Sequence, residues 1–146
     1  MNPANYPGVS LIISGISPDE AAWDSVQECL RSLESQEGVG QFEVLVCAHD
    51  RARSCVPPDF TETFPGVRVL IDSNDSEAAR KNLAVEAARG KIVAILDAGS
   101  RPERSWLRTL LEVFEYYPET AVVSGQAPDE GMLGWLRSAV GRKREA

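Results

Sequence analysis

The chain has 146 residues, of which 43% are hydrophobic and 25% are charged, and its formal net charge is −7. A chain of this length and composition is most simply one folded domain and not a disordered segment. The charge excludes a typical nucleic-acid-binding protein, because basic residues cluster only in the closing GRKREA, which we interpret as a solvated end.

The cysteines and the N-terminus bear on the compartment. Cys29, Cys47 and Cys55 form no Cys-x-x-Cys pair, which argues against a disulfide framework and a structural zinc site and indicates a reducing compartment. The opening MNPANYPGVS lacks the pattern of a signal peptide, and no apolar run approaches the ~20 residues that cross a bilayer. We therefore expect a cytoplasmic protein without a transmembrane segment.

The first half of the chain alternates apolar runs with a helical pattern. The run VSLII at 9–13 predicts a strand that is buried on both faces. The sequence SPDE at 17–20 has the form of a capping box, with Pro18 at the first helical position, and predicts a helix that ends before EGVGQ. Further strands are predicted at 42–47 and 67–71.

The second half continues this alternation. A helix is predicted over 76–89, capped from within DSNDS and stopped by Gly90. The strand that follows, 91–96, leads to a second capping-box pattern at 100–103 and another helix. A fifth strand is predicted at 121–124. The closing region, 126–146, is expected to hold turns and then a short amphipathic segment with Met132, Leu136 and Val140.

Strands that alternate with helices predict an α/β fold of three αβα layers on a mainly parallel sheet of about five strands. We expect one domain over 1–146, with its core at about 9–125. Sheets of this kind bind ligands beyond the carboxyl ends of their strands. The candidate site is therefore formed by the loops after the strands, which are 14–17, 48–53, 72–75 and 97–101.

Asp97 is the strongest candidate in these loops, because it ends an apolar strand at the expected ligand edge. A carboxylate there can hold a ribose hydroxyl or a divalent cation. The alternative is that Asp97 opens the Asp-Ala-Gly-Ser turn and helps to cap the next helix. Ser100 is interpreted as the cap of that helix, and Arg101 and Arg104 either face a diphosphate or are solvated.

Other candidate motifs are weaker. His49 and Asp50 are adjacent on a loop, which rarely gives the geometry of a catalytic pair, and no nucleophile motif accompanies them. Neither the G-x-G-x-x-G nor the G-x-x-x-x-G-K-[ST] motif is present, so dinucleotide-binding and P-loop proteins lose their main support. Asn82 has a low helix propensity, and we expect it to hydrogen-bond a nearby loop.

The arrangement resembles the nucleotide-binding half of family-2 glycosyltransferases, which have the GT-A fold. The resemblance covers about residues 9–125 and is clearest over 79–114. The start of the chain fits through VSLII, CLRSLESQ and FEVLV. The motifs that match in 79–114 are Lys81-Asn82 at an Arg-Asn pair, Ala88-Arg89-Gly90 at the helix end, the strand Ile92–Leu96, Asp97-Ala98-Gly99 at an Asp-x-Asp motif, Pro102, and Trp106-Leu107.

The resemblance implies a function and a set of site residues. It implies binding of a nucleotide-diphosphate sugar, with a UDP-sugar as the expected donor, and transfer of the sugar to an acceptor. Asp97, Lys81, Asn82 and Ser14 would then line the donor site, with Asp97 also contributing to a site for Mg²⁺ or Mn²⁺. The closing segment around Trp135 is also a candidate surface for docking on a second copy of this chain or on a partner chain.

The chain also departs from the family pattern. Gly99 occupies the second Asp position of Asp-x-Asp, and Ala48 and His49 occupy the positions of the base-reading acids. These departures keep two alternatives open, a non-catalytic domain that binds nucleotide sugars or another protein, and an unrelated flavodoxin-like binding domain. The sequence assigns no catalytic residue.

Overall fold

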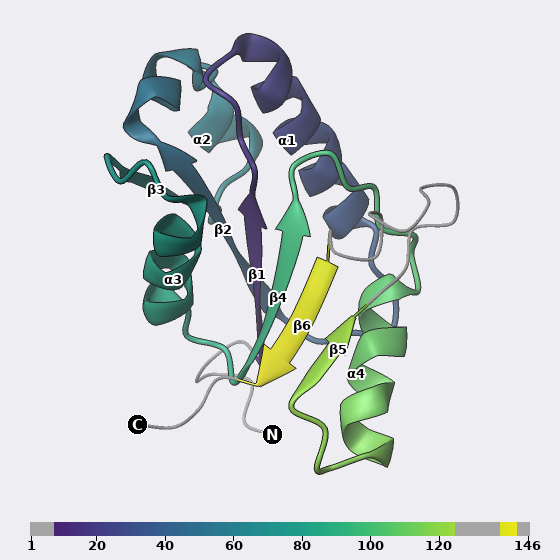
Figure 1. Cartoon of the computed structure of the whole chain (residues 1–146). Coiled ribbons are helices and arrows are strands. Elements are labelled where there is room, and N and C mark those ends of the chain that lie inside the picture. Colours follow the sequence, from purple (N-terminus) through teal and green to yellow (C-terminus); the bar gives the residue numbers. More distant parts are fainter. Residues whose placement is uncertain (1–7, 125–137, 143–146) are drawn as a thin grey trace, which may run out of the picture.

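The computed structural model of the chain describes residues 8–124 and 138–142. Its described strands form one six-stranded sheet with the order β3-β2-β1-β4-β6-β5 (Figure 1). The strands are β1 (Val9–Ser14), β2 (Phe42–His49), β3 (Arg68–Asp72), β4 (Ile92–Asp97), β5 (Val122–Ser124) and β6 (Ser138–Arg142). The first four are mutually parallel, and β6 runs antiparallel to both β4 and β5. The expected mainly parallel sheet is confirmed, and its order differs from that of a flavodoxin-like sheet.

The closing region contains a strand that the sequence did not predict. Val140 was expected in an amphipathic segment but lies in β6, which inserts between β4 and β5 and pairs Ile92–Leu96 with Ser138–Arg142. The segment SAVGR is too short and has too few apolar residues for its periodicity to separate a strand from a helix. The pairing gives β4 a second neighbour, so this central strand has no exposed edge. Met132 and Leu136 lie outside the described residues.

The helices cover both faces of the sheet, which confirms the three-layer arrangement. One core joins the inner sides of α1 (Glu20–Glu34), α2 (Phe60–Thr63) and α4 (Trp106–Tyr116) to one face of β1, β2 and β4. A smaller core joins α3 (Glu77–Ala87) to the other face. Alternate residues of β1 divide between them, with Leu11 and Ile13 in the first core and Ile12 in the second. Among the described helices, none has the length and apolar composition needed to cross a bilayer.

Helix starts follow tertiary contacts as well as local caps. Ser76 caps α3 by accepting from the Ala79 amide, within the segment expected to supply the cap. The cap of α1 is Asp19, which accepts from the Ala22 amide at 2.7 Å, and not the expected Ser17. The expected start of the last helix at Ser100 is also wrong, since α4 begins at Trp106.

The late start of α4 has a contact that explains it. Gln36, which follows α1, accepts from the Leu107 amide at 2.9 Å and donates to the Glu103 carbonyl at 2.7 Å. A side chain from another element thus satisfies an N–H group in the first turn of α4. The segment between β4 and α4 is thereby held as a turn against α1, and this segment carries the candidate site.

A polar network joins the other end of the sheet to the turn before β4. Glu43 accepts hydrogen bonds from Ser10, from the Arg89 amide and from Arg68, and Ser10 accepts from the Gly90 amide at 2.8 Å. A Cβ atom on Gly90 would lie 2.6 Å from the backbone of β1. Since α3 ends at Ala87, Gly90 serves this close approach and is not the helix stop that we expected.

Candidate functional site

The carboxyl ends of the parallel strands meet at one edge of the sheet. The ladder pairs Ser14 with Asp97, and it pairs His49 with Asp72. In Figure 1 the arrowheads of β1, β2 and β4, which mark the carboxyl ends of these strands, point to the top of the view. The structure therefore brings the loops that follow the strands together, as the sequence predicts for a ligand edge.

Asp97 is held at this edge by close backbone contacts. Its carboxylate lies over Gly15, where an added Cβ atom would come within 2.8 Å of Asp97 Oδ1. The Ala98 amide donates to the Ser14 carbonyl, and the Ser100 amide donates to the Asp97 carbonyl, both at 2.9 Å. Asp97 remains half-buried. It thus opens a turn, as one interpretation held, and also presents a carboxylate at the ligand edge.

The other predicted site residues lie in different settings. Ser14 is 2% exposed and supports the edge beside Asp97. Lys81 lies on α3, where its Nζ atom is 2.6 Å from Glu77 Oε1, and Asn82 is exposed on the same helix. The structure therefore pairs Ser14 with Asp97, whereas Lys81 is engaged with its helix neighbour.

Arg101 ties the turn after Asp97 to α1. Its guanidinium binds the carboxylate of Glu28 through Nε and Nη2 and donates through Nη1 to the carbonyls of Ala98 and Ser100. Arg104 is engaged with Glu37 at 3.2 Å. The contacts of Arg101 fix the shape of the turn, because a single guanidinium can satisfy several acceptors at once.

The buried thiol of Cys29 is influenced by the charges of Asp97 and Arg101. Burial raises the pKa of Cys29 to about 11, while Arg101 acts to lower the pKa and Asp97 acts to raise it. The thiol is therefore protonated at neutral pH and is a core residue, not a nucleophile. Asp97 and Arg101 belong to the same turn, since Arg101 donates to the carbonyls of Ala98 and Ser100 directly after Asp97.

A second polar cluster lies at the ends of β2 and β3. His49 Nδ1 accepts from the Arg51 amide at 3.1 Å, and Asp75 Oδ1 lies 3.2 Å from both His49 Nε2 and Arg51 Nη2. Asp50 Oδ1 lies 2.9 Å from His49 Nδ1. His49 thus caps the short helix η1 (Asp50–Cys55) and neighbours an acid from the β3–α3 loop.

Asp75 and Arg51 were not singled out in the sequence, although the loops 72–75 and 48–53 that hold them were expected to form part of the candidate site. Asp75 was also one of several possible helix caps in DSNDS. Its place in a loop after a strand was the available signal, but its distance of about two dozen positions from His49 hid the contact.

The carboxylates at this edge do not form a metal site of the two-acid kind. At the turn after β4 the available donor is Asp97, because Gly99 has no side chain. Within residues 8–124 and 138–142, no group of three or more His, Cys, Asp or Glu residues is arranged to hold a metal ion. The turn after β4 therefore offers a divalent cation one carboxylate, that of Asp97.

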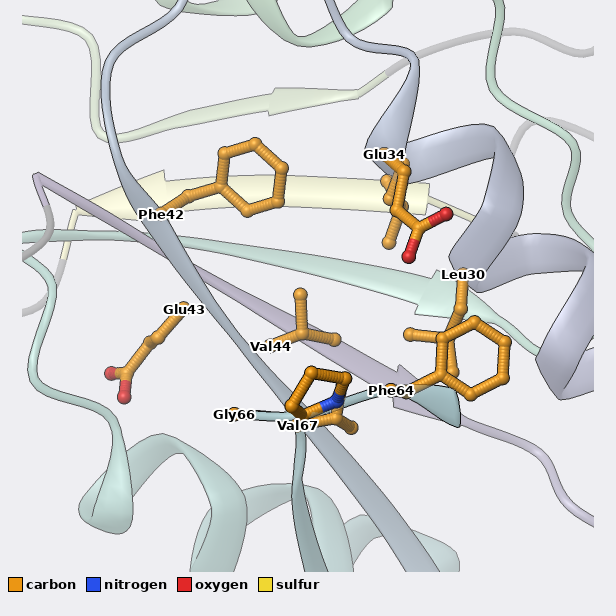
Figure 2. Close-up of a pocket in the computed structure, with 10 residues that line it drawn as sticks. Leu30, Glu34, Phe42, Glu43, Val44, Phe64, Gly66 and Val67 are labelled. Carbon is orange, nitrogen blue, oxygen red and sulfur yellow. The ribbon is translucent and has the colours of Figure 1, made fainter. Parts of the chain in front are cut away.

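A hollow of about 300 Å³ lies at the opposite end of the strands. Its walls come from the last turns of α1, the start of β2 and the segment before β3, and include Phe42, Phe64 and Val67 (Figure 2). Figure 2 shows the Glu43 carboxylate pointing away from the two rings, consistent with its bonds to Ser10 and Arg68. The hollow is mostly apolar and remote from Asp97, so it does not extend the edge described above.

Comparison with known proteins identifies relatives for this arrangement. Protein MT1568 of Mycobacterium tuberculosis is 33% identical over 62% of the chain, and glycosyltransferase AglE of Haloferax volcanii is 28% identical over 71%. Succinoglycan biosynthesis protein ExoO of Rhizobium meliloti is 33% identical over 77% of the chain. The matches span 28%, 34% and 32% of these relatives, respectively, so the chain corresponds to about a third of their length.

Solved structures share the fold. Mannosyltransferase PcManGT from Pyrobaculum calidifontis, in complex with GDP-Man and Mn²⁺, matches 96% of this chain and 46% of its own, with a TM-score of 0.68 and 21% identity. S. aureus TarS 1–349 in complex with UDP-GlcNAc matches 85% of this chain and 36% of its own, with a TM-score of 0.57 and 15% identity. These similarities confirm the expected GT-A fold.

The family model of glycosyl transferase family 2 matches residues 19–141. That range includes the Asp97 turn, the cluster of His49 and Asp75, the strands β2 to β5 and all of β6 except its last residue. The chain therefore belongs to glycosyl transferase family 2.

Proposed function

We propose that this domain binds the nucleoside diphosphate part of a nucleotide sugar at the carboxyl edge of β1–β4, and that it provides the donor site for transfer of the sugar to an acceptor. The observation that carries the proposal is the Asp97 carboxylate, held over Gly15 at the ligand edge of a family-2 chain. A nucleotide sugar is supported as the ligand class by the structural relatives, which hold GDP-Man and UDP-GlcNAc.

Each candidate residue has a role in this proposal. Asp97 accepts a hydrogen bond from a ribose hydroxyl, because an ionised carboxylate is an acceptor of such donors. Ser14 forms the floor beside it. Lys81 and Asn82 line the α3 side, where Lys81 must exchange Glu77 for the ligand. We propose a UDP-sugar as the donor.

The transfer step sets a further requirement. The bond between the sugar and the diphosphate breaks as the acceptor hydroxyl attacks, and the leaving diphosphate gains negative charge that positive groups must stabilise. Mg²⁺ or Mn²⁺ would supply this stabilisation when bound, and one structural relative holds Mn²⁺. Since the described residues offer only Asp97 at this turn, we assign no step to a metal here.

A non-catalytic nucleotide-sugar-binding domain is the second candidate. Gly99 favours it, because the family's second acid is missing from the turn. The two candidates share the donor site and differ in turnover. Release of UDP from a UDP-sugar in the presence of acceptors would support transfer, and tight binding without release would support the second candidate.

The test of the donor site is a ligand titration followed by thermal unfolding and calorimetry. UDP, UDP-sugars and GDP-sugars are compared, and a ligand at a hundred times its dissociation constant should add about 2.7 kcal/mol to the free energy of unfolding. Asp97→Asn keeps the shape of the side chain and removes its charge, and we expect it to weaken binding about tenfold. Glu115→Gln, an exposed change on the last turn of α4, is the matched control and should leave binding unchanged. Equal binding by wild type and Asp97→Asn would contradict the proposed site.

The compartment remains part of the proposal. The cysteines among the described residues are all free, which fits a reducing environment. We therefore propose the cytoplasm as the compartment.

A further inference from the structure

The turn after β4 has room for the acid that it lacks. Gly99 is exposed, and a Cβ atom added there would meet no atom within 4 Å. Gly99 is also absent from the glycines with positive φ, which are Gly15, Gly38 and Gly66. Neither crowding nor backbone conformation therefore requires glycine at this position. A carboxylate at residue 99 is missing for a reason other than the fold.

Without that acid, the turn offers little to a divalent cation. Mg²⁺ is bound by oxygen ligands and needs at least one protein carboxylate beside the substrate phosphates, whereas the proposed function already gives the Asp97 carboxylate to a ribose hydroxyl. Asp97 Oδ1 lies close to Gly15 and also faces the Gly99 amide at 3.5 Å. Arg101 donates to the carbonyls of Ala98 and Ser100 in the same turn, while its charge is balanced by Glu28. These two carbonyl oxygens are therefore already hydrogen-bonded and are less available to a metal ion.

We propose that this domain binds nucleoside diphosphates without a divalent metal, and that Gly99 is the residue that determines this metal independence. The inference rests on the proposed function, because it concerns the same ligand at the same edge. It predicts that one substitution, Gly99→Asp, creates metal-dependent binding in a turn that is otherwise unchanged. Gly99→Asn has nearly the same shape without the charge and is the matched control.

The experiment measures the affinity of wild type, Gly99→Asp and Gly99→Asn for UDP and GDP by calorimetry, once with Mn²⁺ and once with a chelator. Binding of Mn²⁺ itself is followed by loss of the electron paramagnetic resonance signal of the free ion. Thermal unfolding shows that each variant is folded, which the open space around Gly99 leads us to expect.

Wild type and Gly99→Asn should bind the nucleotide with affinities that differ by less than about twofold between Mn²⁺ and chelator. Gly99→Asp should bind about tenfold more tightly with Mn²⁺ than with chelator, and should deplete free Mn²⁺ in the presence of nucleotide. Wild-type binding that requires Mn²⁺ would overturn the inference and leave the proposed function standing. Unchanged metal dependence in Gly99→Asp would overturn the role of Gly99. Absence of nucleotide binding in wild type under both conditions would overturn the proposed function and the inference with it.

Discussion

Gly15 gives the Asp97 carboxylate the space that it occupies. Its φ of +73° is in the left-handed region, which side chains with a Cβ atom avoid. Its missing side chain also leaves room for Asp97 Oδ1, which would otherwise lie 2.8 Å from a Cβ atom. Position 15, beside the candidate site, therefore requires glycine for two separate reasons, its backbone conformation and the space that the Asp97 carboxylate occupies.

Gly15→Ala should consequently lower both stability and nucleotide affinity. The left-handed conformation costs a non-glycine residue about 1–2 kcal/mol, and the displaced carboxylate weakens its contact with the ligand. Urea unfolding and UDP calorimetry measure the two effects. Gly40→Ala is the control, since Gly40 has no positive φ and a Cβ atom there meets nothing within 4 Å. A Gly15→Ala variant with unchanged stability and affinity would show that neither demand matters.

At the scale of elements, a half-buried carboxylate joins three strands to the turn before β4. Glu43 on β2 accepts from Ser10 on β1, from Arg68 on β3 and from the Arg89 amide. Burial alone would raise the pKa of Glu43, but these hydrogen bonds and the Arg68 charge together hold the pKa below its ordinary value. The network therefore stabilises the folded protein with Glu43 in its ionised form.

This network predicts a pH dependence of stability. Because the folded pKa of Glu43 is lower than the unfolded one, its contribution is fully present above the unfolded pKa of about 4.3 and is lost as the pH falls through the folded value. Glu43→Gln should cost about 1–3 kcal/mol at pH 7, and its stability should change less than that of wild type below about pH 5. Urea unfolding at a series of pH values measures both effects.

The exposed Glu115→Gln provides the comparison for this change. Its stability curve should follow that of wild type at every pH. A Glu43→Gln variant that also follows wild type would show that the network contributes nothing to stability.

The strands and helices differ in how far the sequence alone could predict them. The apolar runs of β1, β2, β3 and β4 identified these strands, and β1 is buried along its whole length, on both faces. The start of α4 could not be found locally, because the side chain of Gln36 from another element caps it. Strand β6 was missed because the short segment SAVGR has no strand pattern of its own and becomes a strand through its pairing with β4 and β5.

The candidate site was predictable to the extent that it depends on strand ends. Asp97 and Ser14 follow or end apolar runs, and parallel pairing brings them together. The neighbourhood of His49 and Asp75 depends on the path of the β3–α3 loop, which no local pattern specifies. The absence of a second acid at Gly99 was visible in the sequence, but the open space around it was a property of the fold.

At the scale of the whole molecule, the two ends of the sheet offer different chemistry. The carboxyl edge has Asp97, His49 and Asp75 from separate elements, whereas the amino end has an apolar hollow beside Phe42 and Phe64. A nucleotide carries hydroxyls, phosphates and a polar base, so its binding site needs polar partners. The family and the fold favour the carboxyl edge as that site.

The most direct measurement is an amide NMR titration of the wild-type protein with UDP and GDP. Shift changes should concentrate at residues 14–16, 49–51, 72–76 and 97–101, and Asp97→Asn should need about ten times more nucleotide to reach them while its spectrum without nucleotide stays that of the folded protein. Changes that centre on residues 42–44 and 64–67 at the apolar hollow, or a spectrum that neither nucleotide alters, would contradict a nucleotide site at the carboxyl edge.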